Sequence, residues 1–133
     1  VSRVKGSIGY VEFAYAKKNK IPHTQLENRN GLFVDPDDTT FAAAAANADW
    51  FSVPGMGISL VNQRGTKAWP ITGATFVLMY KNPADKAASN EALKFFDWSF
   101  KNGKKMAEEL DYVALPDSLI KAITERVWRD IAR

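Results

Sequence analysis

Strand-like and helix-like segments alternate along this chain of 133 residues, and that order predicts an α/β protein. Three observations support the prediction. Residues 76–80 form a continuous apolar run, helical periodicity begins near residue 89, and 46% of the residues are hydrophobic, which is enough for a packed core. The sequence has no internal repeat, and its one low-complexity tract is the alanine run at residues 42–46.

The first predicted elements are short. Residues 7–10 are predicted to form a strand between glycines, and residues 11–19 a helix that Pro22 ends. Residues 25–34 predict an extended hairpin, because the Asn30-Gly31 pair in its turn readily supplies the positive φ angles that a tight hairpin needs.

A helix is predicted at residues 39–48. The carboxylates of Asp35, Asp37 and Asp38 precede it and can accept hydrogen bonds from its unpaired N–H groups. Glycines and a proline then predict an irregular connection at residues 51–65, with a strand-like turn at residues 58–61.

The second half begins with a predicted strand at residues 69–81. Its continuous apolar run is bounded by Asn82-Pro83, a pattern typical of a strand that is buried on both faces of a central sheet. Helices are predicted at residues 89–101 and 104–111, and a last helix from residue 117 onward. The repeating apolar positions are Leu93, Phe96 and Phe100 in the first of these helices and Leu119, Ile123, Val127 and Ile131 in the last.

The charge pattern does not indicate a nucleic-acid surface. Eighteen Lys and Arg residues and 15 Asp and Glu residues give a net charge of +3, and the two signs are interspersed. The absence of cysteine excludes disulfides, thiolate metal sites and a cysteine nucleophile.

Two glycine-rich stretches could suggest a phosphate or nucleotide loop. The run Gly6-Ser7-Ile8-Gly9 has neither the spacing of a nucleophile elbow nor the Lys of a Walker loop, so a structural turn is the preferred interpretation. In the run from Gly55 to Leu60, Leu60 replaces the third glycine of a dinucleotide fingerprint.

Histidine and carboxylate groups could suggest a metal or an acid–base pair. His23 is the only histidine and is predicted to be a surface loop residue, while Asp35, Asp37 and Asp38 lack the spacing of a calcium loop. The remaining acidic cluster is predicted to be a solvated, Lys-rich helix face; it contains Glu108, Glu109 and Asp111. No nucleophile–base pair can be assembled, so the chain is not expected to be an enzyme or to hold a cofactor or metal.

Aromatic and basic residues in the second half admit two further interpretations. Their helical spacing predicts that the aromatic residues belong to the core instead of forming a ligand platform; they are Phe95, Phe96, Trp98 and Phe100, together with Trp50, Trp69 and Trp128. The basic residues that could grip nucleic-acid phosphates are Lys104, Lys105, Arg126, Arg129 and Arg133. Interleaved acids and an inward-facing Leu119, Ile123 and Val127 argue against that interpretation.

Four segments rich in Trp, Tyr and Pro occur in the order and spacing of a known family. They are Gly6-Ser7-Ile8-Gly9-Tyr10-Val11-Glu12, Trp69-Pro70-Ile71-Thr72, Leu93-Lys94-Phe95-Phe96-Asp97-Trp98 and Leu110-Asp111-Tyr112-Val113-Ala114-Leu115-Pro116-Asp117-Ser118. From Gly6 to about Arg133, the chain resembles the carboxy-terminal part of the substrate-binding protein of bacterial phosphate-specific ABC transporters.

The resemblance implies a periplasmic-binding-protein type II fold, in which two lobes close over one phosphate. Residues 1–68 would then be the carboxy-terminal part of the second lobe, and residues 69–133 would return to complete the first. The implied partners are inorganic phosphate, membrane permease subunits and a complementary amino-terminal segment, without nucleic acid. The implied location is periplasmic, or extracytoplasmic and membrane-anchored in Gram-positive relatives.

The resemblance assigns no phosphate ligand to this chain. In the family the ligands are a Thr-Phe pair, a Ser, an Asp and an Arg followed by Ser-Gly-Thr, all of which precede the matched part. Arg64-Gly65-Thr66 and Thr72-Gly73-Ala74-Thr75 match neither the order nor the place of that motif. Because the chain starts at Val1 without Met or a signal sequence, it is predicted to be a piece of a longer protein.

Two alternatives stay open at this point. One is a protein of the same fold that binds another oxyanion or acts in adhesion or signalling, and the other is an independent helical interaction or nucleic-acid-binding module. If the chain is a piece, strand edges and apolar helix residues should be uncovered, among them Phe95, Phe96, Ile123 and Val127.

Overall fold

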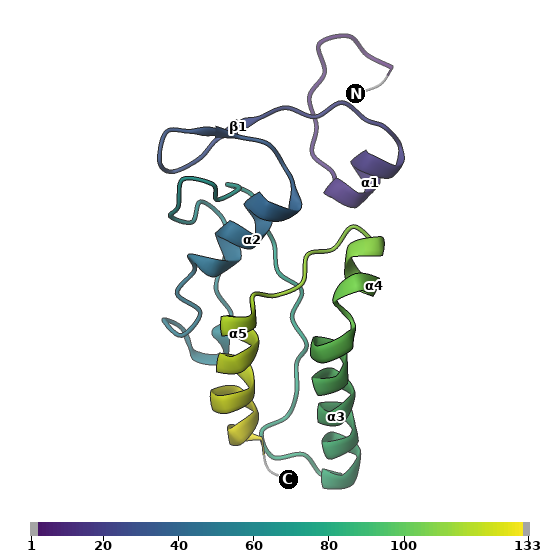
Figure 1. Ribbon diagram of the computed structural model, residues 1–133, viewed down its shortest axis with the longest axis vertical. Helices are drawn as coiled ribbons and strands as arrows, with labels where there is room; N and C mark the ends of the chain where they lie inside the picture. Colours follow the sequence, from purple (N-terminus) through teal and green to yellow (C-terminus); the bar gives the residue numbers. More distant parts are fainter. Residues whose placement is uncertain (1–2, 132–133) are drawn as a thin grey trace.

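Helices dominate the computed structural model, which describes residues 3–131 (Figure 1). The α-helices are α1 (Phe13–Lys18), α2 (Asp38–Ala46), α3 (Lys86–Asn102), α4 (Lys104–Glu109) and α5 (Asp117–Ala122). Strands β1 (Leu26–Glu27) and β2 (Phe33–Val34) form the two-stranded sheet of the described chain. The mixture of helix and strand agrees with the predicted α/β class, although strands are few.

The amino-terminal strand prediction was wrong. Residues 7–10 form no strand, and the side chains of Ile8 and Tyr10 are 90% and 96% exposed. An extended segment becomes a strand only where another strand pairs with its backbone, and the described residues provide none here. Helix α1 follows within the predicted range and buries Ala16.

The predicted hairpin is confirmed. Strands β1 and β2 pair antiparallel, with Leu26 opposite Val34. In the turn only Gly31 of the Asn-Gly pair has a positive φ, at 76°. The buried Asn28 side chain holds the turn, because its Oδ1 accepts from the N–H groups of Asn30 at 3.0 Å and Leu32 at 3.2 Å. Its Nδ2 donates to the carbonyl of Thr66 at 2.9 Å, which ties the hairpin to a distant loop.

Helix α2 begins with the predicted carboxylate cap. Asp37 Oδ1 accepts from the N–H groups of Thr39 at 2.8 Å and Thr40 at 2.9 Å. In return the Thr40 hydroxyl accepts from the Asp37 N–H at 3.0 Å, which completes a capping box. Of the three aspartates predicted to cap this helix, Asp37 supplies the side-chain bonds.

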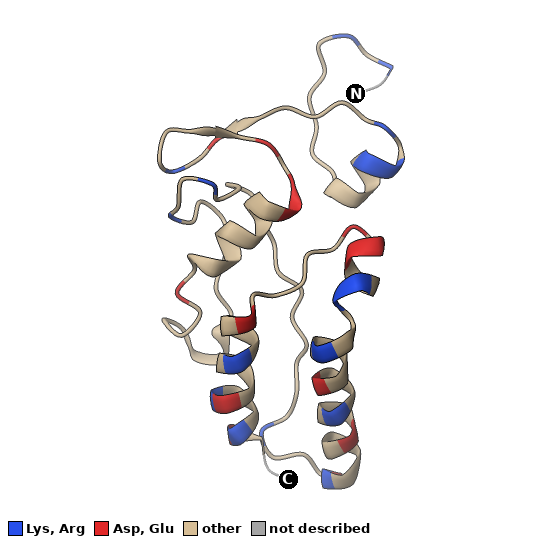
Figure 2. Ribbon diagram, viewed as in Figure 1, with Lys and Arg blue, Asp and Glu red and all other residues tan. Residues whose placement is uncertain are grey.

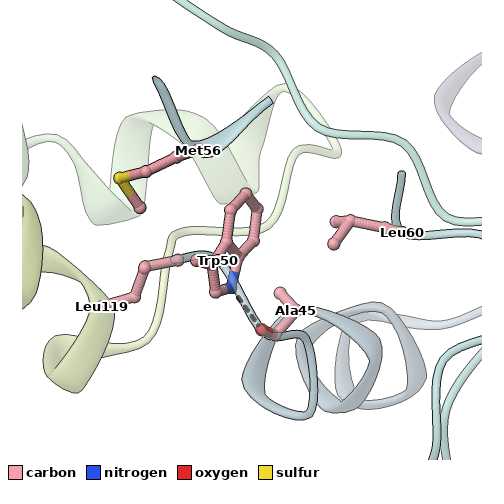
Figure 3. Close-up of a cluster of buried hydrophobic side chains, with 5 residues drawn as sticks. All are labelled: Ala45, Trp50, Met56, Leu60 and Leu119. Carbon is pink, nitrogen blue, oxygen red and sulfur yellow. Dashed lines mark hydrogen bonds between the residues drawn. The ribbon is translucent and has the colours of Figure 1, made fainter. Parts of the chain in front are cut away.

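Two clusters of buried apolar side chains form the core. The first surrounds Trp50, whose indole N–H donates to the Ala45 carbonyl at 2.8 Å (Figure 3). Its buried members are Ala45, Trp50, Met56, Leu60 and Leu119. In the second cluster Leu93, Trp128 and Ile131 are buried, and the Phe100 ring stacks on Trp128. Ile123 and Val127 pack against both clusters, so these residues are less uncovered than expected.

The central strand predicted at residues 69–81 is absent. Ile71 forms an isolated antiparallel bridge with Val61, and residues 72–80 continue as extended chain without strand pairing. Instead of being buried on both faces, Val77, Leu78 and Tyr80 are 61%, 93% and 83% exposed. The apolar run has the composition of a buried strand, but the described residues contain no neighbouring strands to cover it.

The carboxy-terminal helices largely follow the prediction. Helix α3 starts three residues earlier than expected, because the Asp85 carboxylate accepts from the Ala88 N–H at 2.9 Å and caps it. Residues 51–65 are irregular as predicted, apart from a 3₁₀ turn at Pro54–Met56. The last helix is less regular than its four-residue repeat indicated. After α5 the chain forms a π-helical turn at Ile123–Val127 and a 3₁₀ turn at Trp128–Asp130.

Candidate functional site

The most unusual feature of the described chain is the extended segment at residues 72–80, which we call the unpaired segment. It is anchored at its start, where the Asn62 N–H donates to the Pro70 carbonyl at 2.8 Å and Val61 bridges Ile71. Beyond that point, no backbone hydrogen bond joins residues 72–80 to any other part of residues 3–131. Its peptide groups are therefore free to pair with another strand.

Some side chains of the unpaired segment are packed and others are exposed. Ala74 lies against the Trp50 cluster and Met79 against the Trp128 cluster, while the Phe76 ring contacts the Trp50 ring at a centroid distance of 6.3 Å. Val77, Leu78 and Tyr80 are each more than half exposed. A contiguous run of exposed apolar residues of this kind is a typical interaction surface.

Helix α3 also has uncovered aromatic side chains. The prediction that its aromatics belong to the core holds for Phe96 and Phe100, which pack against the Trp128 cluster. It was wrong for Phe95 and Trp98, which are 60% and 50% exposed. Helical spacing identifies the buried face, but it does not show whether further aromatic residues beside that face are buried or exposed. The other predicted core tryptophans, Trp50, Trp69 and Trp128, are buried.

The glycine stretches form no ligand cradle. Residues 6–9 are exposed, and Gly6 has a φ of 79°, which fits the structural turn that we predicted. Gly55 lies in a 3₁₀ turn with a φ of 73° and does not join a strand to a helix, as a dinucleotide loop requires.

Two segments, residues 64–66 and 72–75, partly resemble the Arg and Ser-Gly-Thr ligand motif of the family. Polar groups in both segments form hydrogen bonds within the chain. The Gly65 N–H donates to the Asn30 side chain at 3.0 Å, and the Thr72 hydroxyl donates to the Trp69 carbonyl at 3.1 Å. These groups serve the hairpin and the bend before the unpaired segment. That the chain carries no phosphate ligand remains a prediction.

The carboxylates near α2 have separate roles, and Asp37 is the one that caps the helix. Asp37 binds the Thr39 hydroxyl at 2.6 Å, and this hydrogen bond, with further bonds from the backbone and side chain of Thr40, lowers the pKa of Asp37 below its usual value. Asp35 accepts a hydrogen bond from the Gln25 side chain at 2.8 Å. His23 lies on the surface, as predicted, with its ring edge-on to Phe13 at 5.8 Å.

Two of the three acids near the end of α4 lie on the predicted solvated face. Glu108 and Glu109 pair with Lys104 and Lys105 one turn earlier, at 4.0 Å and 3.9 Å. Asp111 was misplaced by that prediction, because it lies beyond the helix and forms a hydrogen-bonded ion pair with Lys17 of α1. That hydrogen bond, reinforced by the charge attraction, raises the pKa of Lys17 above its usual value.

The other basic residues form no single stripe. Arg126 lies over the Phe51 ring at 4.7 Å from its centroid, and Lys121 faces Glu125 at 3.8 Å. Arg129 is exposed, and Arg133 lies outside the described residues. Leu119, Ile123 and Val127 pack inward, as expected of a structural helix.

A cavity for a small ligand is not apparent in the described part of the chain. A shallow depression of about 190 Å³ lies between Trp50 and Leu119, and a broader one of about 410 Å³ lies between α3 and α5. Within residues 3–131 no three His, Asp or Glu side chains gather as a metal site would require, and no helix has the length and apolar character to cross a membrane.

Comparison with known proteins places the chain in a family, although no protein-family model matches it. Proteins named phosphate-binding protein PstS are 49% identical over 129 residues in Pasteurella multocida and 49% identical over 128 residues in Xylella fastidiosa. These alignments cover 97% and 96% of the chain. A phosphate-binding protein PstS of Methanocaldococcus jannaschii is 34% identical over 128 residues, covering 86% of the chain.

The chain spans only part of each relative. It covers 37% of the Pasteurella protein, 35% of the Xylella protein and 32% of the Methanocaldococcus protein. Identity at this level over nearly the whole chain, in relatives almost three times as long, confirms the resemblance that the four sequence segments indicated. The chain therefore belongs to the PstS family of phosphate-binding proteins, in which it corresponds to a carboxy-terminal portion.

Proposed function

We propose that the complete protein is the extracytoplasmic solute-binding component of a phosphate ABC transporter, and that this chain is mainly its scaffold. The observation that carries the proposal is the 49% identity to phosphate-binding protein PstS over 97% of the chain. The complete protein captures inorganic phosphate in the periplasm and delivers it to membrane permease subunits. It does so by binding alone, without catalysis or a cofactor.

The proposed fold is the two-lobed periplasmic-binding-protein fold of type II. Residues 1–68 belong to the second lobe and residues 69–133 return to the first. The unpaired segment supports this division, because residues 72–80 have the apolar composition of a central strand and an open backbone. Its neighbouring strands lie in the part of the protein that precedes this chain.

Phosphate is bound by groups outside this chain. A desolvated phosphate dianion needs several converging donors and an Arg to offset the loss of water. The candidate Arg64 is exposed, and the adjacent Gly65 N–H is bonded to Asn30, so this loop offers no converging set. The chain completes both lobes structurally, and residues outside it bind the phosphate.

Isothermal titration calorimetry tests the proposal. The complete protein should bind phosphate saturably, whereas the 133 residues expressed alone should give no saturable heat at millimolar phosphate. Sulfate and arsenate titrations of the complete protein distinguish a phosphate carrier from a carrier of another oxyanion. A micromolar dissociation constant for the chain alone would contradict the claim that the ligands lie elsewhere.

A further inference from the structure

We propose that the ion pair between Lys17 and Asp111 is a clasp between the two lobes, and that it strengthens phosphate binding by favouring the closed arrangement. This inference rests on the proposed function, because it requires two lobes that close over phosphate. Lys17 lies in the part assigned to the second lobe and Asp111 in the part assigned to the first. They are 94 positions apart in the sequence.

The end of α4 holds Asp111 in a position that local structure does not favour. The Tyr112 N–H donates to the Ala107 carbonyl at 2.9 Å and the Asp111 N–H to the Glu108 carbonyl at 3.0 Å, which makes a Schellman motif. Asp111 has a φ of 59° at the position where glycine is usual. A carboxylate at this negative end of the helix dipole is also unfavourable, so its presence calls for a cation nearby.

The cation is Lys17 of α1. The carboxy-terminal end of α1 has the same hydrogen-bond pattern as that of α4. The Ile21 N–H donates to the Ala16 carbonyl at 2.9 Å and the Lys20 N–H to the Lys17 carbonyl at 3.1 Å, while Lys20 has a φ of 53°. The last turn of α1 is therefore fixed, and Lys17 lies in it. Figure 2 shows this basic end of α1 above the acidic end of α4.

The two ends have opposite charge. Lys17, Lys18 and Lys20 lie at the end of α1, and the acidic residues at the end of α4 are Glu108, Glu109 and Asp111. Glu108 and Glu109 already face lysines of their own helix, whereas Asp111 is paired across the boundary between the proposed lobes. Lys17 also experiences a weaker attraction from Asp38, which belongs to its own proposed lobe.

A contact of this kind acts on the equilibrium between open and closed lobes. The two proposed lobes share the Trp50 cluster, into which Leu119 packs, and are joined by the Val61–Ile71 bridge. The Lys17–Asp111 pair is a further, partly exposed contact between them. A hydrogen-bonded ion pair requires contact distance, so an opening of a few ångströms breaks it. Because the ion pair forms only when the lobes are closed, it raises the population of the closed protein. It therefore tightens the binding of any ligand that needs closure.

The test measures the phosphate dissociation constant of the complete protein and of charge-removing variants. Asp111→Asn keeps the shape and suits the left-handed backbone, and Lys17→Met keeps the apolar stem of the side chain. Each should weaken phosphate binding about two- to fivefold, the range of a partly exposed ion pair. The double variant should be no weaker than either single variant, because both remove the same bond.

Matched controls separate the clasp from a general charge effect. Lys18→Met removes a neighbouring positive charge, and Asp38→Asn removes the acid on the same proposed lobe as Lys17. Both should leave the dissociation constant within about 1.5-fold of the unmodified protein, since neither side chain makes the bond across the lobes. A structural role alone would lower the melting temperature equally with and without phosphate, whereas a clasp lowers it mainly in the presence of phosphate.

The outcomes distinguish the two proposals. If the unmodified protein binds phosphate and both Asp111→Asn and Lys17→Met bind it equally tightly, the clasp is refuted while the proposed function stands. Equal weakening by Lys18→Met would also refute the clasp, because the effect would then be one of net charge. If the unmodified protein binds no phosphate, the proposed function is refuted and the clasp with it.

Discussion

Two regions of the chain can be compared: the hairpin together with α2, and the unpaired segment together with α3. They differ in how many of their polar groups have hydrogen-bond partners, and how many of their apolar side chains are buried, within residues 3–131. In the first region, Asn28 bonds its own turn and the Thr66 carbonyl, and Asp37 caps α2. In the second region, the peptide groups of residues 72–80 have no partner within residues 3–131, and Leu78 is 93% exposed. The difference leads us to infer that the second region, unlike the first, needs further polypeptide to cover it.

The largest expected effect is at Leu78. If residues from elsewhere in the complete protein cover the unpaired segment, Leu78→Ala should lower its free energy of unfolding by about 2–5 kcal/mol, as for a buried leucine. Leu32→Ala is the matched control, because Leu32 lies in the self-contained hairpin and is 47% exposed. The control should change stability by about 0.5 kcal/mol or less in urea unfolding. If Leu78→Ala and Leu32→Ala both lowered the free energy of unfolding by the same small amount, Leu78 would not be covered in the complete protein, and the two regions would not differ as we propose.

A smaller loss is expected at Asn28. Its side chain is 5% exposed and bonds the backbone of Asn30, Leu32 and Thr66. Asn28→Ala leaves these groups without their partner and should cost about 1–3 kcal/mol in the complete protein. The exposed neighbour Arg29 gives the control variant Arg29→Ala, which should be nearly neutral. An Asn28→Ala protein as stable as the control would show that the hairpin does not depend on this network.

The smallest expected effect is at the α2 cap. Asp37→Ala should cost about 1 kcal/mol at neutral pH. Because the folded-state pKa of Asp37 lies below its usual value of 3.8, its contribution is complete above that value and is lost as the pH falls through the lowered pKa. Urea unfolding between pH 7 and pH 3 should therefore show the difference from the unmodified protein shrinking in acid. Asp37→Asn, which keeps an acceptor, should show little loss at pH 7.

Sequence alone predicted what short-range chemistry determines. The Asn30-Gly31 turn and the Asp37 cap each depend on residues within a few positions, and both are present. The early start of α3 was missed because Asp85 was not recognised as its cap, although its position before a helical run was a usable signal.

The features that sequence did not predict depend on distant groups. Residues 76–80 have the composition of a buried strand, but strand pairing requires neighbours that the described residues do not supply. Phe95 shares a helix with the buried Leu93 and yet is exposed, because no described residue packs over that side of α3. The Lys17–Asp111 pair joins residues 94 positions apart, and nothing in the local sequence of either indicates the other.

The most direct test of the central claim compares the 133-residue chain alone with the same chain mixed with the remaining amino-terminal polypeptide. Sedimentation velocity and circular dichroism would be measured on both samples at low concentration. We predict that the chain alone self-associates or unfolds without cooperativity, and that the mixture forms a one-to-one complex with a cooperative transition. A cooperatively folded monomer of the chain alone would contradict the account, because the unpaired segment and the exposed side of α3 would then need no cover.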